Sequence, residues 1–109
     1  FEEFKGALSE QYVLQQLVAD KRVSLYYWSA EKSTAEIDFL IQYRDRVIPI
    51  EVKAEENLQA KSLRSFVQKY LPKIAIRSSM SDFREEEWLT NFPLYSICEL
   101  TTYIEGKQV

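Results

Sequence analysis

Apolar and polar residues alternate along two neighbouring segments in the middle of the chain. In residues 36–42 (EIDFLIQ), Ile37, Phe39 and Ile41 are apolar and occupy every second position. In residues 47–54 (VIPIEVKA), Ile48, Ile50 and Val52 show the same spacing. Because successive side chains of a strand point to opposite faces, each segment is predicted to be a β-strand with one core face. Asp38, Glu51 and Lys53 fall on the other face, where charged side chains need partners if they are buried.

The rest of the pattern predicts helices before and after this pair of strands. Strand and helix signals then alternate, so the order is α-β-β-β-α-β-β(-α), an α/β (α+β) fold with a mixed β-sheet flanked by helices. At 109 residues the chain is long enough for a single domain over residues 1–109. The other predicted elements are helices at 3–20 and 58–71, strands at 24–29, 74–79 and 93–97, and a closing helix at 99–105.

Two residue types are scarce, and their scarcity narrows the chemistry. The chain has no histidine, which excludes Ser-His-Asp and Cys-His catalysis and most structural zinc sites. It has only two glycines, so no Gly-rich phosphate loop is present, and we expect any ATP site to belong to another part of a longer protein. No segment approaches the roughly 20 apolar residues of a membrane helix. We therefore expect an excised domain with no membrane partner and a cytoplasmic location.

Charge is distributed unevenly along the chain. Residues 57–81 contain five basic residues and no acidic one, so this window is +5 while the whole chain is −3, leaving −8 elsewhere. Within the predicted second helix, Lys61, Arg64 and Gln68 are spaced by three and four residues and share one face. Two interpretations stay open: this face holds nucleic-acid phosphates, or it is an ordinary solvated helix face.

The two central strands are predicted to form an antiparallel hairpin with a two-residue turn at 44–45. In that register Asp38 lies opposite Glu51, and Glu36 lies opposite Lys53. Two carboxylates that face each other repel, which destabilises the sheet unless their charge is balanced. Lys53 can neutralise them, one carboxylate can stay protonated, or a divalent cation can bridge them.

Of these three ways to balance the two carboxylates, a bridging cation would also support catalysis. Carboxylate oxygens suit Mg²⁺ or Mn²⁺, and such an ion beside Lys53 is suited to hydrolysis of a phosphodiester. Lys53 would orient water or stabilise negative charge. Glu10, on a first helix expected to pack over the same sheet face, would supply a further ligand or hold a second ion.

These residues resemble the signature of the PD-(D/E)xK nuclease superfamily. Asp38 is followed by Glu51-Val52-Lys53, with a helical Glu10 upstream. The resemblance implies a restriction-endonuclease-like fold and metal ligands at Asp38 and Glu51, with the backbone carbonyl of Val52 as a further ligand. It also implies that Lys53 is the catalytic lysine and Glu10 an accessory acid.

A closer resemblance covers nearly the whole chain. It is to bacterial and archaeal proteins in which an AAA+-like ATPase domain precedes a C-terminal, nuclease-like domain of unknown function. This chain is identified with that C-terminal domain, which implies the ATPase domain of the same chain as a partner. The segments that carry the resemblance are residues 6–8 (GAL), 26–28 (YYW), 35–39 (AEIDF), 48–54 (IPIEVKA), 61–66 (KSLRSF) and 93–95 (PLY).

A second interpretation of the hairpin stays open. Glu36 and Lys53 can form a cross-strand ion pair on a solvated face, with Asp38 and Glu51 each exposed to water. The domain would then keep the nuclease scaffold without catalysis and act as a nucleic-acid-, protein- or ATPase-binding module.

Overall fold

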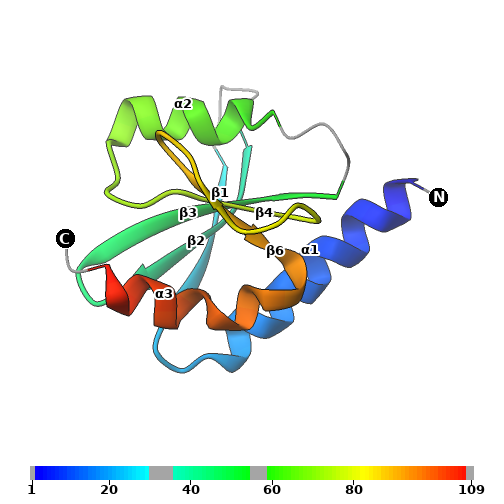
Figure 1. Ribbon diagram of the computed structural model, residues 1–109, viewed down its shortest axis with the longest axis horizontal. Coiled ribbons are helices and arrows are strands. Elements are labelled where there is room, and N and C mark those ends of the chain that lie inside the picture. The colour runs from blue at the N-terminus through cyan, green and yellow to red at the C-terminus, as the bar shows by residue number, and fades with distance from the viewer. Residues whose placement is uncertain (1, 30–35, 55–58, 108–109) are drawn as a thin grey trace.

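A computed structural model describes residues 2–29, 36–54 and 59–107, and the side chains of residues 2–4, 28–29 and 36–38 lie outside this description. The described residues form three layers, with one helix on one face of a central sheet and two helices on the other (Figure 1). This is the mixed, helix-flanked sheet that the sequence predicts. Among the described residues, no helix is both long and apolar enough to cross a lipid bilayer.

The helices and strands follow the predicted order, with one addition. The addition is a two-residue strand inside the acidic segment before Trp88. The elements are α1 (Glu2–Ala19), β1 (Ser24–Ser29), β2 (Glu36–Tyr43), β3 (Arg46–Lys53), α2 (Lys61–Tyr70), β4 (Ile76–Ser79), β5 (Arg84–Glu85), β6 (Thr90–Pro93), the 3₁₀ helix η1 (Leu94–Glu99) and α3 (Leu100–Gly106).

The strands are ordered β1-β2-β3-β4-β6-β5 in one sheet. Strand β2 is antiparallel to both of its neighbours, β1 and β3, whereas β3, β4 and β6 run parallel. The β2–β3 register runs from Tyr43 opposite Arg46 to Phe39 opposite Ile50. The predicted two-residue turn and the register that follows from it are therefore confirmed over the paired residues.

The alternation along the strands creates two separate cores. On one face, Ile48, Ile50 and Val52 of β3 pack with Val13 and Leu17 of α1 and with residues of η1 and α3. On the other face, Leu63 and Phe66 of α2 pack with Ala75 and Leu89. Figure 1 shows α2 on one side of the sheet and α1 with α3 on the opposite side.

This arrangement corrects one expectation about α1. Glu51 and Lys53 alternate with the residues of β3 that face α1, so they belong to the α2 face of the sheet. The first helix does not pack over the face that carries Glu51. It buries Val13 and Leu17 on the other face because both residues fall on its apolar stripe.

The predicted fifth strand at residues 93–97 is wrong in its position. The strand is Thr90–Pro93, and the chain then turns into η1. Leu94 and Ile97 are both buried and lie three residues apart, which is the spacing of a tight helix rather than of a strand. The closing helix is confirmed as α3.

Candidate functional site at the carboxyl end of strand β3

Glu51 and Lys53 lie at the carboxyl end of β3, and Lys53 is the last residue of the strand. Glu51 is 8% exposed, its Oε2 atom is enclosed, and Lys53 is half-buried. The expectation that Glu51 lies in a solvated face is therefore wrong, because α2 and the neighbouring strands cover it. A carboxylate this enclosed requires compensation of its charge.

Asp38 lies in β2, but its side chain is outside the described residues, as is that of Glu36. The recorded pairs end at Phe39 opposite Ile50. The predicted pairing of Asp38 with Glu51, and of Glu36 with Lys53, is the continuation of that register and stays a prediction.

Arg77 is the cation that the structure places beside Glu51. The two residues are register partners on the parallel strands β3 and β4, and Arg77 is only 4% exposed. Its Nε atom donates a 2.8 Å hydrogen bond to Oδ1 of Asn91, and its Nη2 atom pairs with the Glu86 carboxylate. Arg77 was one of the five basic residues of the charged window, but it belongs to the interior rather than to a basic surface.

Asn91 organises the polar side chains around Arg77. It is fully buried, and its Oδ1 atom accepts from Arg77 and from the Ser79 hydroxyl, the latter at 2.7 Å. Its Nδ2 atom donates to the backbone carbonyls of Ser81 and Asp82 at 3.1 and 3.0 Å. An amide side chain offers two acceptor positions and two donors, so all four of its positions are used. This connectivity fixes the direction of Arg77.

The partner of Arg77 remains an anion in the folded state. Burial is the largest single influence and raises the pKa of the Glu86 carboxyl, but the hydrogen bonds and charges of Arg77 and Arg84 together lower it by more. The pKa of Glu86 is therefore below its usual value. The Arg77–Glu86 contact is a charged pair on the α2 face of the sheet.

The predicted phosphate-binding residues lie beside this network. Lys61, Arg64 and Gln68 are all exposed on α2, as their spacing predicts. Lys61 and Arg64 line a pocket of about 400 Å³, and Gln68 is not part of its lining. The other lining residues are Gln59, Ala60, Arg77, Glu86, Trp88 and Leu89.

Glu10 is exposed on α1. Its helix packs on the face of the sheet opposite to Glu51, as the shared core of α1 with Ile50 and Val52 requires. Any contribution from Glu10 to a site at Glu51 has to be made around the end of the sheet and not across its surface.

The sequence predicts a metal site with a small set of oxygen donors. Within the described side chains, no group of three or more histidine, cysteine, aspartate or glutamate residues is placed to hold an ion. Magnesium, however, binds through one or two carboxylates and keeps several waters. Glu51, with the predicted donors Asp38 and the Val52 carbonyl, provides hard oxygen ligands of the kind that Mg²⁺ or Mn²⁺ prefers.

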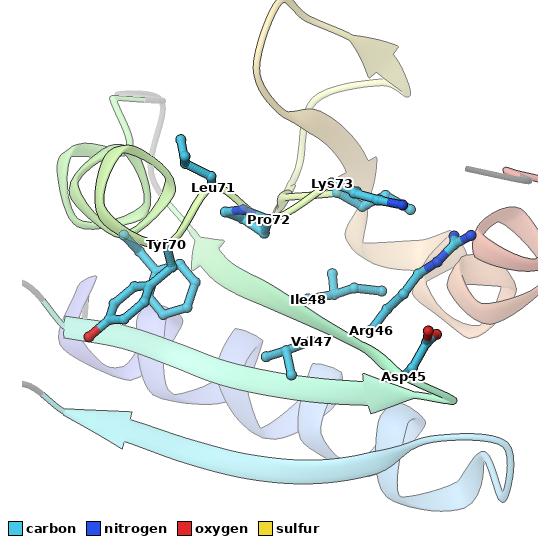
Figure 2. A pocket seen from close by; sticks show the side chains of 10 residues that line it. Asp45, Arg46, Val47, Ile48, Tyr70, Leu71, Pro72 and Lys73 are labelled. Carbon is cyan, nitrogen blue, oxygen red and sulfur yellow. The ribbon is translucent and has the colours of Figure 1, made fainter.

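A different pocket opens at the other end of β3. It measures about 550 Å³ and is lined by the start of β3, the end of α2 and residues 71–74. Figure 2 shows the charged ends of Arg46 and Lys73 on one side of it, away from Tyr70. Five residues separate Ile48 from Lys53, which is about 17 Å along a strand. This pocket includes none of the predicted site residues.

Three residues of the site were not singled out from the sequence: Arg77, Asn91 and Glu86. A signal for Arg77 exists, because it interrupts the apolar alternation of IAIRSS at the position that faces away from Ile76. The register of parallel strands, however, is not set by a short turn, so its partnership with Glu51 could not be read from the sequence.

Comparison with known protein families matches residues 5–97 to the model of a domain of unknown function (DUF4143). The match begins at Lys5 in α1, covers strands β1 to β6, and ends at Ile97 in η1. No curated protein matches the chain.

Proposed function

Since the chain belongs to the DUF4143 family, we propose that it is a metal-dependent, nuclease-like module that hydrolyses phosphodiester bonds of DNA or RNA. In the full-length protein the module is attached to an AAA+-like ATPase domain. The observation that carries the proposal is the hairpin register beside a buried Glu51. If the register continues by one residue past Phe39 and Ile50, Asp38 lies opposite Glu51; β2 shifts its register with β1 over the same stretch, between Leu40 and Ile37.

The proposed roles follow the chemistry of each side chain. Asp38 and Glu51, with the Val52 carbonyl, are the oxygen donors that would hold Mg²⁺ or Mn²⁺. When bound, such an ion neutralises charge on the phosphate and lowers the pKa of a coordinated water. Lys53, half-buried two residues after Glu51, would orient the attacking water and stabilise negative charge on the phosphate oxygens.

The remaining predicted residues act around this centre. Glu10 would accept a hydrogen bond from a water at the end of the sheet. Lys61, Arg64 and Gln68 are exposed along one face of α2 and would contact backbone phosphates. Lys61 lies in the first turn of α2. Because α2 runs antiparallel to β3 and β4, the strands that it connects, this turn is close to the carboxyl end of β3, and the phosphate contacts would begin there.

A second candidate function is a non-catalytic module that keeps this scaffold and binds nucleic acid, a protein or its own ATPase domain. The observation that favours it is the position of Arg77, which brings a permanent positive charge beside Glu51. A carboxylate with a guanidinium neighbour has its charge balanced without a divalent ion.

The test is cleavage of plasmid and single-stranded substrates in Mg²⁺ or Mn²⁺, comparing the wild type with Lys53→Ala and with Lys69→Ala. Lys69 is an exposed lysine on α2 and serves as the matched control. The proposal expects metal-dependent cleavage that Lys53→Ala abolishes and Lys69→Ala retains. Cleavage that is absent, or that is equal in both variants, supports the binding module instead.

A further inference from the structure

The pocket beside Arg77 combines an apolar floor with a cationic rim. Ala60 and Leu89 are buried at 7% and 4% exposure, and both belong to the core under α2. Lys61 and Arg64 lie on the exposed side of the helix and reach the same pocket.

Trp88 gives the pocket an aromatic wall. It is half-buried, packs against the core that includes Leu63 and Leu89, and lines the pocket. A tryptophan held by a core on one side and reachable from a pocket on the other is a rigid surface on which a planar ring can stack.

The cations of the pocket divide into two kinds. Arg77 is committed to Asn91 and Glu86, so it forms part of the wall. Lys61 and Arg64 are exposed, and they are one turn apart on α2. The Glu86 carboxylate also lines the pocket, and its charge is paired with Arg77 and Arg84.

From these features we propose that the pocket takes one unpaired nucleotide of a nucleic-acid strand. The base stacks on Trp88 above Ala60 and Leu89, and the adjoining phosphate is held by Lys61 and Arg64. A volume of about 400 Å³ admits a single nucleotide. This deepens the proposed nuclease function, on which it rests for the choice of nucleic acid, and it names the substrate as single-stranded.

A base in a duplex cannot enter the pocket without leaving its stack, because its faces are covered by neighbouring base pairs. The pocket is next to the site at Glu51, since Arg77 both lines it and is the register partner of Glu51. A strand with one base in the pocket is therefore held beside the proposed centre of hydrolysis.

The experiment measures binding of a labelled 12-nucleotide single strand by fluorescence anisotropy in EDTA, so that no cleavage occurs. The arms are the same strand, its duplex, and free adenosine monophosphate as competitor. The variants are the pair Lys61→Ala/Arg64→Ala, Trp88→Leu, and the control pair Lys69→Ala/Lys73→Ala, which removes equal charge from exposed positions outside this pocket.

The proposal expects the single strand to bind about tenfold more tightly than the duplex and far more tightly than the free nucleotide. Lys61→Ala/Arg64→Ala and Trp88→Leu should each weaken binding by about tenfold, whereas the control pair should change it less than about threefold. Loss of the contacts to this one phosphate should also reduce the slope of log K against log salt by about 0.7.

Equal or tighter binding of the duplex, competition by the free nucleotide at the strand's own affinity, or unchanged binding in both pocket variants would overturn the proposal. If Trp88→Leu does not fold, quenching of Trp88 emission in a Trp28→Phe background replaces it, and absence of quenching counts against the pocket. Binding in EDTA without later cleavage in Mg²⁺ would remove the nuclease function and keep the pocket. Cleavage in Mg²⁺ together with unchanged strand binding by the pocket variants would keep the nuclease function and remove the pocket.

Discussion

Glu51 and Arg77 are register partners on the parallel strands β3 and β4, and both are nearly excluded from solvent, at 8% and 4% exposure. The guanidinium of Arg77 is therefore the nearest cation to Glu51 across the strand pair. The charge at the end of β3 is thus set by Arg77 together with Lys53. Any ion held there adds to a centre that already contains two cations.

Removing Arg77 is expected to destabilise the domain strongly. Arg77→Met leaves the buried Asn91 amide without this donor and the partly exposed Glu86 carboxylate with Arg84 alone, so the free energy of unfolding should fall by about 2–3 kcal/mol. Urea denaturation measures it. Arg84→Met is the matched control, because Arg84 pairs with the same Glu86 oxygen at 3.2 Å but is half-exposed. That variant should lose less than about 1 kcal/mol, and equal losses in the two variants would refute the account of the network.

The Asn91 amide should matter more than the Ser79 hydroxyl that donates to it. Asn91→Leu keeps the branching and the number of heavy atoms of the side chain and removes all four hydrogen bonds, so unfolding free energy should drop by about 2–4 kcal/mol. Ser79→Ala removes a single donor to the same Oδ1 atom and should cost about 1 kcal/mol. Chemical denaturation compares them, and a larger loss in Ser79→Ala would show that Asn91 is not the organising residue.

The end of α2 offers a stabilising substitution. Leu71 adopts the left-handed conformation (φ 51°, ψ 51°), donates its N–H to the Val67 carbonyl and is 77% exposed. Glycine adopts this conformation without strain, so Leu71→Gly should raise the free energy of unfolding by about 0.5–1 kcal/mol after the greater freedom of the unfolded chain is subtracted. Leu71→Ala keeps the strain and should stay within about 0.5 kcal/mol of the wild type. The prediction fails if thermal unfolding gives the two variants the same midpoint.

Stability at acidic pH should depend on Asp20. The hydrogen bond from Arg22 is the largest influence and lowers the pKa of the Asp20 carboxyl to about 2, against 3.8 for an unperturbed group. A carboxyl whose pKa is depressed by folding stabilises the protein fully above the unfolded value, and this contribution is lost as pH falls from 3.8 towards 2. Between these limits the wild type should lose stability more steeply than Asp20→Asn. Parallel pH profiles of the two proteins would contradict the assignment.

The β2–β3 hairpin shows what a sequence pattern can determine. The two-residue turn and the alternation of apolar residues fixed a register that the structure confirms from Tyr43–Arg46 to Phe39–Ile50, although the turn contains no glycine. Arg44 takes the positive φ of 56° that such a turn requires. Registers of this kind are predictable because a slip by one residue would expose a whole apolar face.

The neighbour of Glu51 on the next strand, Arg77, could not be predicted from the alternation of apolar residues. Arg77 lies 26 positions further along the chain and reaches Glu51 only because β4 pairs with β3 in parallel after the α2 crossover. Composition placed Arg77 in a basic surface window, whereas hydrogen bonds to Asn91 and Glu86 hold it in the interior. Charge counted along a sequence does not distinguish a buried arginine from an exposed one. The face that α1 covers was also misjudged, because a helical stripe shows which residues are buried but not against which face of a sheet.

The central claim, that Asp38 and Glu51 hold a divalent ion, is tested most directly by calorimetric titration with Mn²⁺. The wild type should bind Mn²⁺ with an enthalpy signal that Asp38→Asn and Glu51→Gln each abolish, while Asp45→Asn, a carboxylate at the opposite end of β3, leaves it unchanged. Asp38→Asn is the decisive variant, because Glu51→Gln also alters the surroundings of Arg77. A wild type that binds no Mn²⁺, or binding that survives in Asp38→Asn and Glu51→Gln alike, would contradict the claim.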